Sequence, residues 1–198
     1  MASKIVTCSK SEFASDLESL RDRSIKPTKV RQLVSELTKS VVQDVITAPD
    51  ADEKLAIIVI LRSGMAMSDS FVSQLPADAD VSIYHLGLFR DKTSLQPVEY
   101  YNKLPAKDPK IKHAYVLDPV LATGGTVTAA INILKDWGVP KVTVVNILAS
   151  KVGLAAASNV WPESTDFIVG AIDPEVDAKG HIQPGIGDIG DRLYGTGA

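Results

Sequence analysis

One stretch of the chain combines residue types that suit the binding of a phosphate group. The sequence "VLDPVLATGGTV" (116–127) passes from apolar residues through Asp118 to two adjacent glycines with a threonine on either side. Gly124 and Gly125 have no Cβ, so an anion can approach their backbone N–H groups closely. A helix that begins here would add unpaired N–H groups and the positive end of its dipole. The stretch therefore indicates a cradle for a monophosphate, and the alternative is a tight turn without a ligand.

Other common site motifs do not describe this stretch. A Walker loop needs Gly-Lys-Ser/Thr at a fixed spacing and a dinucleotide fingerprint needs G-x-G-x-x-G, and neither occurs between the strand and the helix. The chain contains no G-x-S-x-G nucleophile elbow. His85, His113 and His181 are far apart and lack metal-ligand spacing with Cys8, so we expect them to be ordinary surface or core residues.

Alternating apolar segments are expected to position these residues. The continuous aliphatic run 54–64 is typical of a strand buried on both faces, and further strands are expected at 80–90, 113–118, 141–150 and 166–173. Helical spacing predicts helices at 11–23, with Ser11 as the candidate N-cap, and at 28–46, 64–75, 125–137 and 152–160. This alternation predicts an α/β fold with a mostly parallel sheet and helices on both faces. In such sheets ligands bind outside the carboxyl ends of the strands.

Composition narrows the class of protein. The 198 residues are enough for one domain with a sizeable core, and the net charge of -3 argues against a nucleic-acid binder. A single cysteine, Cys8, fits a reducing compartment. The N-terminus lacks the apolar core of a signal peptide, and the longest apolar run, 55–61, is too short to cross a bilayer. We therefore expect a cytoplasmic protein with no nucleic-acid or membrane partner.

Several segments, taken in order, resemble one family. "VLDPVLATGGTV" resembles the phosphoribosyl-diphosphate (PRPP) loop of type I phosphoribosyltransferases, and its Asp118-Pro119 pair is similar to that of uracil phosphoribosyltransferases. The likeness extends through "LRSGMAMSD" (61–69), "LFRDKTSLQPVEYYNKLP" (88–105) and "PGIGDIGDRLYGT" (184–196). It implies the type I phosphoribosyltransferase fold in a single domain over residues 1–198. The segment 91–112 would be a protruding lid loop, and 173–198 a small C-terminal hood that binds the base.

The resemblance implies the reaction of uracil with PRPP to give UMP and diphosphate, as in pyrimidine salvage. Asp118, Arg62 and Arg90 would be the catalytic residues. Both arginines end strand candidates, and a guanidinium suits a diphosphate through forked hydrogen bonds. The implied PRPP-binding residues are Arg62, Arg90, Asp118, Pro119, Val120, Leu121, Ala122, Thr123, Gly124, Gly125, Thr126 and Asp188. The implied uracil-binding residues are Ile182, Gly187, Asp188 and Ile189.

The resemblance also implies partners. Mg²⁺ would be the cofactor, held mainly by PRPP oxygens and water rather than by protein ligands. A homodimer or higher homo-oligomer and activation by GTP are implied for some members. The chain departs from the family pattern at Ser63, where alanine is common, and at Ile189, which adds bulk in the uracil turn. A phosphoribosyltransferase for another nucleobase, and a non-catalytic PRPP-binding or regulatory homologue, remain the alternatives.

Overall fold

The apolar segments form the strands and helices of one layered α/β arrangement. The computed structural model describes residues 2–46, 49–50, 52–91 and 97–197, without the side chain of Arg90. The strands are β1 (Ile5–Thr7), β2 (Lys54–Leu61), β3 (Asp80–Arg90), β4 (Pro97–Asn102), β5 (Ile111–Leu117), β6 (Val120–Leu121), β7 (Lys141–Ser150), β8 (Thr165–Asp173), β9 (Glu175–Val176) and β10 (Ile182–Gln183). The helices are α1 (Ser11–Arg21), α2 (Pro27–Val42), α3 (Met65–Val72), α4 (Gly125–Trp137), α5 (Lys151–Ser158) and α6 (Ile189–Tyr194).

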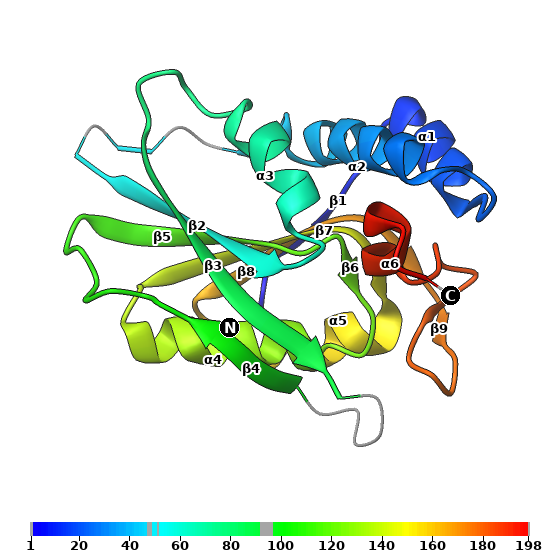
Figure 1. Cartoon of the computed structure of the whole chain (residues 1–198). Helices are drawn as coiled ribbons and strands as arrows, with labels where there is room; N and C mark the ends of the chain where they lie inside the picture. The colour runs from blue at the N-terminus through cyan, green and yellow to red at the C-terminus, as the bar shows by residue number, and fades with distance from the viewer. Residues whose placement is uncertain (1, 47–48, 51, 92–96, 198) are drawn as a thin grey trace.

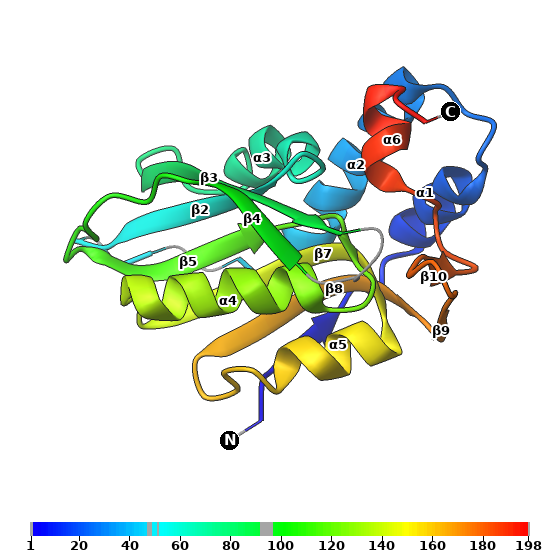
Figure 2. The same ribbon diagram turned by 60° about the horizontal axis from the view of Figure 1, so that its bottom comes forward.

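The central sheet is mostly parallel. Its strand order is β1-β8-β7-β5-β2-β3-β4, with β6 beside β7. The paired strands of this sheet run parallel, apart from the antiparallel pair β3 and β4. Helices α1, α2 and α3 lie on one face, and α4 and α5 on the other (Figures 1 and 2). The predicted fold class is confirmed.

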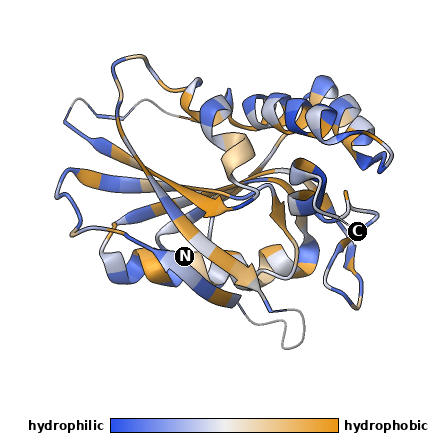
Figure 3. Ribbon diagram, viewed as in Figure 1, coloured by the Kyte–Doolittle hydropathy of each residue, from blue (hydrophilic) through white to orange (hydrophobic). Residues whose placement is uncertain are grey.

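Two apolar clusters hold these layers together, one on each face of the sheet. The first joins α1, α2 and α3 to the sheet, and the second joins α4 and α5 to it. β2 contributes to both, because its residues Leu55–Ile60 are at most 2% exposed. Full burial of a Leu or Ile side chain stabilises the fold by about 1.5–3 kcal/mol. The apolar colouring of the central strands is visible in Figure 3.

Helix boundaries follow the sequence signals in some places and not in others. α4 ends as predicted at Gly138, whose φ of 86° places it in the left-handed region and whose N–H bonds to the carbonyls of Leu134 and Lys135. The prediction that Ser11 is the N-cap of α1 is wrong, because Lys10 occupies the N-cap and Ser11 is the first helical residue. α2 starts at Pro27, whose fixed φ suits the first helical position, and it stops at Val42, four residues before the predicted end.

The order of the strands brings two turns together at the carboxyl edge. From β2 the chain continues to β3 on one side, and later returns to β5 on the other side of β2. β2 and β5 pair in parallel with Val59 opposite Leu117, so their carboxyl ends are adjacent. The turn that begins at Arg62 therefore lies beside Asp118. This is a topological switch point, the place in an open parallel sheet where ligands bind.

Two segments outside the regular alternation have structure of their own. The lid segment 91–112 was expected to be irregular, but β4 pairs antiparallel with β3 from Leu86–Asn102 to Arg90–Pro97, so part of it extends the sheet. Residues 92–96 of that segment lie outside the described residues. The hood contains the antiparallel pair β9 and β10 followed by α6. Among the described residues, no helix is long and apolar enough to cross a membrane.

Candidate functional site

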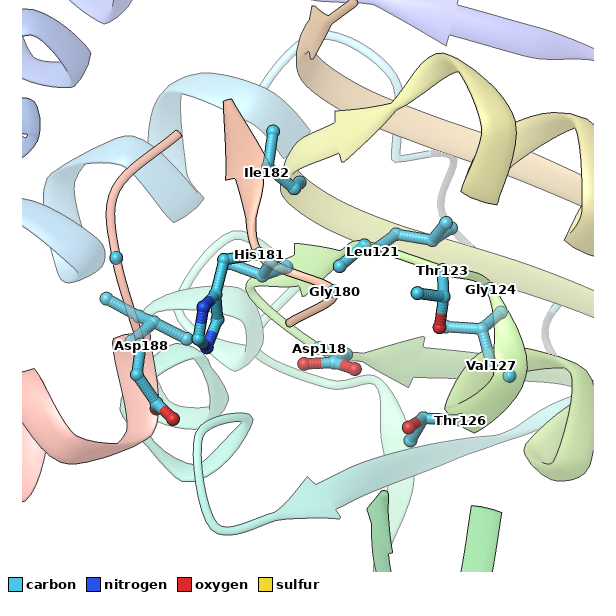
Figure 4. A pocket seen from close by; sticks show the side chains of 15 residues that line it. Asp118, Leu121, Thr123, Gly124, Thr126, Val127, Gly180, His181, Ile182 and Asp188 are labelled. Atoms are coloured by element: carbon cyan, nitrogen blue, oxygen red, sulfur yellow. The ribbon is translucent and has the colours of Figure 1, made fainter. Parts of the chain in front are cut away.

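Two adjoining hollows lie at the carboxyl edge of the sheet. One is lined by the loop 120–127 and by the hood residues 180–182 and 187–189, and the other by the turn 60–63, β3 and β4. They share Asp118, Val120, Thr126, Asp188 and Ile189. Figure 4 shows Asp118 and Thr126 on one side of the first hollow and His181 and Asp188 on the other. The predicted loop, turn and hood therefore meet at a single site.

The loop between β6 and α4 has the geometry of an anion cradle. Gly124 has a φ of 88°, which only glycine adopts readily, and α4 begins directly after it at Gly125. A Cβ on Gly124 would lie 2.7 Å from the carbonyl oxygen of Gly153, so that side of the loop is closed by α5. The first N–H groups of α4 have no intrahelical partner. Together with the helix dipole, they give the loop a geometry and a partial positive charge that suit a phosphate group.

The N-terminus of α5 packs against the loop 122–126 and holds it in place. Ser150 caps α5 by accepting a hydrogen bond of 2.9 Å from the N–H of Gly153, and its hydroxyl donates to the carbonyl of Ala122. A Cβ on Gly153 would collide with the same carbonyl. The small residues at the start of α5 thus let its N-terminus press against the loop, which keeps the cradle in one conformation.

Asp118 is a buried carboxyl group with few partners. The residue is 6% exposed, and Ser63 Oγ donates to its Oδ1 over 3.3 Å. Asn146 Nδ2 donates to the Asp118 backbone carbonyl at 2.7 Å and fixes the chain at this point. Burial raises the pKa of Asp118 from 3.8 to about 7, and hydrogen bonds from the Val120 N–H and from Ser63 oppose this rise. The carboxyl is therefore poised to lose or gain its proton near neutral pH.

The raised pKa of Asp118 predicts a pH-dependent stability. The native state holds this proton more tightly than the unfolded chain, so the contribution of Asp118 to stability is complete below about pH 4 and is lost as the pH rises through about 7. We expect Asp118→Asn to exceed the wild type in free energy of unfolding by roughly 2–4 kcal/mol at pH 8. The gain should be absent at pH 4. Urea unfolding of both proteins at the two pH values measures it, and an equal difference at both would contradict the assignment.

Arg62 lies at the mouth of the second hollow. The peptide bond between Leu61 and Arg62 is cis, and the Arg62 side chain is 51% exposed. Its Nη2 lies 3.3 Å from Asp191 Oδ1, and its Nη1 donates to Thr196 Oγ1 over 3.4 Å. A guanidinium has five N–H donors, so most remain available to oxygens of a ligand. This position suits the binding of a diphosphate.

The hood is attached to the N-terminal helices by polar contacts, most of them partly buried. Arg21 forms two 2.8 Å hydrogen bonds to Asp173 and a third, of 3.0 Å, to the carbonyl of Gly185. Asp173 also accepts a bond of 2.9 Å from the Gly185 N–H. The guanidinium of Arg192 donates to the carbonyls of Leu20, Asp22 and Ile186 at 2.6 Å. These contacts fix the glycine-rich turn between the base of the hood and α6.

Four hood residues expected to contact a base lie at the first hollow. Ile182, Gly187, Asp188 and Ile189 all line it. Asp188 is the N-cap of α6 and accepts from the N–H of Asp191 at 3.1 Å. Ile189 is 6% exposed and packs in the apolar cluster on the α1–α3 face. Much of its bulk is therefore taken up by the core.

His181 is a site-lining residue that the sequence analysis missed. It was expected to be an ordinary surface or core histidine, but it lines the first hollow next to Gly180 and Ile182 (Figure 4). Asp177 holds it there by accepting from the His181 N–H at 2.9 Å, and its Oδ2 lies 3.8 Å from His181 Nδ1. No motif signal marked His181, because its place depends on the fold of the β9–β10 hairpin.

Of the remaining predicted site residues, most line the first hollow, Pro119 does not, and the side chain of Arg90 is not described. Leu121, Ala122, Thr123 and Gly125 line the first hollow with Val120. Pro119 does not line either hollow, and its carbonyl accepts the N–H groups of Ile147 and Leu148 at 3.0 Å. Arg90 ends β3 opposite Pro97, while its side chain lies outside the described part of the structure. Among the described residues, no group of three His, Cys, Asp or Glu side chains could hold a metal ion.

Comparison with known proteins places the chain among nucleotide-forming transferases. Residues 47–196 match the family model described as uracil phosphoribosyltransferase. The chain is 47% identical over 179 residues to urg2 of Schizosaccharomyces pombe, named as a candidate uracil phosphoribosyltransferase, with 90% of this chain and 84% of urg2 covered. It is 38% identical over 198 residues to the uracil phosphoribosyltransferase of Dictyoglomus turgidum, with 91% and 93% covered.

Solved structures agree in fold. The structure of the AQ2163 protein from Aquifex aeolicus superimposes with a TM-score of 0.82 at 26% identity, covering 96% of this chain and 97% of that chain. A hypoxanthine-guanine phosphoribosyltransferase from Bacillus anthracis gives a TM-score of 0.51 at 14% identity, covering 79% and 83%, and shows likeness of fold alone.

Proposed function

The chain belongs to the uracil phosphoribosyltransferase family, and on that premise we infer that it transfers a phosphoribosyl group from PRPP to uracil. The products are UMP and diphosphate, so the protein is a pentosyltransferase of pyrimidine salvage. In the reaction the bond from ribose C1 to the diphosphate oxygen breaks, and diphosphate leaves with the electron pair. A bond from C1 to N1 of uracil forms, and N1 gives up its proton.

The convergence of three segments at one edge of the sheet carries this proposal. The loop 122–126 offers a phosphate cradle, Arg62 offers a fork for a diphosphate, and the hood offers a glycine-rich turn. Asp118 lies in the part shared by both hollows. PRPP carries a 5′-phosphate at one end and a 1-diphosphate at the other, with the ribose between them. The order of groups along the site matches the order of groups along this substrate.

The proposed roles follow from position. The loop 122–126 binds the 5′-phosphate, and Asp118 faces the ribose hydroxyls and the positive charge that develops on the ring. Arg62 binds the diphosphate, whose negative charge grows as it leaves. Arg90 is proposed as a second diphosphate ligand because it ends the neighbouring strand β3. Asp188 lines both hollows and is therefore proposed to contact both substrates.

Uracil is proposed to bind in the first hollow against the backbone of Ile182, Gly187, Asp188 and Ile189. Uracil is small and uncharged, so backbone donors and acceptors can read its edge. Packing of Ile189 into the core supports a base compartment that is not narrowed by its added bulk. A phosphoribosyltransferase for another base is the second candidate, since His181 also reaches this compartment.

One assay tests the reaction. The protein is incubated with PRPP, Mg²⁺ and each of a panel of nucleobases, and release of diphosphate and the nucleotide product are followed. We expect UMP from uracil as the main product. If a different base were converted and no UMP formed, that base would replace uracil as the proposed substrate. PRPP binding without any product would instead support a PRPP-sensing homologue, and salt-sensitive RNA binding would support a regulatory one.

Gly125→Ala separates phosphate binding from folding. A Cβ at Gly125 would meet nothing closer than Pro97 Cδ at 3.7 Å, and alanine favours a helical position over glycine. We expect an unchanged or slightly higher melting temperature, together with a KM for PRPP raised by about tenfold because the methyl group fills the cradle. Steady-state kinetics and thermal unfolding measure the two effects. An unaltered KM would remove this loop from the 5′-phosphate site.

Mg²⁺ is the proposed cofactor. Asp118 and Asp188 both line the second hollow, so the site has carboxylate oxygens near the proposed diphosphate position. Mg²⁺ keeps several waters and is commonly bound through one or two carboxylates and substrate phosphates, which fits this donor set. When bound, the ion would neutralise charge on the diphosphate. The protein residues orient the substrate around it.

The β3–β4 hairpin supports the proposals of a lid and of an oligomer. Tyr100 and Phe89 line the second hollow and are also 54% and 47% exposed. We propose that the segment 91–112 covers the bound substrates and excludes water, which would otherwise hydrolyse an activated PRPP.

Further apolar residues of the β3–β4 edge, Ile83 and Val98, are 44% and 38% exposed, which supports their burial in a homodimer or higher homo-oligomer.

Oligomeric state, effector and location each have a direct test. Light scattering of the purified protein gives its mass in solution, and a monomer at all concentrations would overturn the oligomer. GTP is proposed as an activator by family likeness alone, and initial rates measured with and without GTP test this proposal. A cytoplasmic location is proposed from the single cysteine and is tested by cell fractionation.

A further inference from the structure

The turn at Arg62 is held by the last helix of the chain. The hydroxyl of Tyr194 donates to the Arg62 backbone carbonyl at 2.8 Å. The Arg62 side chain meets Asp191 at 3.3 Å and Thr196 at 3.4 Å, and the Thr196 hydroxyl donates to the same Asp191 oxygen at 2.6 Å. Backbone and side chain of Arg62 are therefore both fixed by residues 129 to 134 positions later in the sequence.

Tyr194 is itself fixed from the other side. The guanidinium carbons of Arg31 and Arg62 lie 4.7 Å and 5.3 Å from the centre of its ring, within the range of cation–π attraction. Arg31 belongs to α2, and its Nε donates to the Leu193 carbonyl at 3.0 Å. α2 thus anchors α6, and α6 in turn supports the turn at Arg62. The chain of contacts runs from Arg31 on the exposed side of α2 to the mouth of the second hollow.

α6 also begins at the base compartment. Asp188, which lines both hollows, caps its N-terminus, and Gly195 closes its C-terminus with a φ of 65°. A Cβ on Gly190 would lie 3.6 Å from Arg62 Nη2, so the first turn of the helix passes close to the guanidinium. One short helix with both ends capped therefore spans the distance between the hood turn and Arg62.

We infer that Asp191 and Tyr194 are positioning residues that hold Arg62 in the orientation needed to bind the diphosphate of PRPP. This rests on the proposed role of Arg62. Asp191 and Thr196 each contact one terminal nitrogen of the guanidinium, and Tyr194 contacts its carbon through the ring and the Arg62 backbone carbonyl through the hydroxyl. These contacts leave several of the five N–H donors for a ligand in the second hollow, which Arg62 lines. If Asp191 instead competed with the diphosphate for Arg62, its removal would have the opposite effect on affinity. The sign of that effect therefore separates the two roles.

The test uses Asp191→Asn and Tyr194→Phe in the full chain, each alone and combined with Arg62→Ala. Calorimetric titration with inorganic diphosphate and Mg²⁺ gives binding, and steady-state kinetics give the KM for PRPP and for uracil. We expect each single variant to weaken diphosphate binding about fivefold and to raise the KM for PRPP by a similar factor, with the KM for uracil unchanged. In the Arg62→Ala background we expect neither change to have a further effect, because both act through Arg62.

Three results would overturn this role. These are tighter diphosphate binding in Asp191→Asn, effects that add fully to that of Arg62→Ala, or affinities equal to those of the wild type. Melting temperatures of both variants within about 2 °C of the wild type would show that weaker binding is not a loss of folding. A wild type that makes no UMP from PRPP and uracil would overturn the proposed function. An active wild type with unaltered variants would overturn the positioning role alone.

Discussion

Asp118→Asn is expected to lower kcat by about 10²- to 10³-fold, the size of effect seen when one preorganised electrostatic group is removed from an active site. The amide has the shape of the carboxyl and keeps an oxygen that can accept hydrogen bonds from the ribose hydroxyls proposed to lie there. It lacks the negative charge that we propose stabilises the positive charge developing on the ribose ring. Binding of PRPP in the ground state should therefore change little, and the loss should appear in kcat rather than in KM.

The pH dependence of kcat/KM tests the role of Asp118 independently. Because burial raises the pKa of Asp118 to about 7, the carboxyl of the free enzyme is largely protonated in mild acid. We expect kcat/KM for PRPP in the wild type to rise with pH through this range and then to level off. The variant should lack this rise, since its side chain does not titrate.

Controls distinguish this effect from a general loss of charge. Asp136 lies on the exposed surface of α4, away from both hollows, and Asp136→Asn makes the same chemical change there. It should retain the activity and the pH profile of the wild type. If Asp118→Asn kept more than about a tenth of kcat, the carboxylate would not have the proposed role in stabilising the transition state, because such a loss corresponds to only about 1.4 kcal/mol.

The parts of the site that could be predicted from sequence are those whose signals are local. The loop 122–126 follows a buried strand and precedes a helix with a clear apolar stripe, so its place at the carboxyl edge followed from the chain alone. Arg62 and Asp118 each come directly after a strand, and parallel strands end at a common edge. These residues are now seen to lie at neighbouring strand ends.

The parts that could not be predicted depend on long-range contacts. The hood is held by Arg21 and Asp173, which are 152 positions apart, and no local pattern links them. His181 reaches the first hollow because Asp177 shapes the β9–β10 hairpin around it. β4 was missed because its residues are mostly exposed and lack the apolar alternation of a half-buried strand. Local propensity carries little information where tertiary pairing decides the conformation.

Arg62→Ala is expected to raise the KM for PRPP by about 10- to 100-fold, because a hydrogen bond between charged groups contributes about 1.5–3 kcal/mol. A fall in kcat should accompany it, since the charge on the diphosphate increases as the bond to C1 breaks. The KM for uracil should change much less, because Arg62 does not line the first hollow, in which uracil is proposed to bind. Initial rates over a grid of both substrates separate these constants.

Arg62→Lys serves as the matched variant for this prediction. Lysine keeps the positive charge but has no planar fork, so activity should fall between that of the wild type and that of Arg62→Ala. Folding should survive both changes, because the Arg62 side chain is half exposed and its contacts with Asp191 and Thr196 are long. Melting temperatures close to that of the wild type would confirm this. If Arg62→Ala then kept the KM for PRPP of the wild type, the diphosphate would have to bind elsewhere on the carboxyl edge, and the end of β3 at Arg90 would be the next place to test.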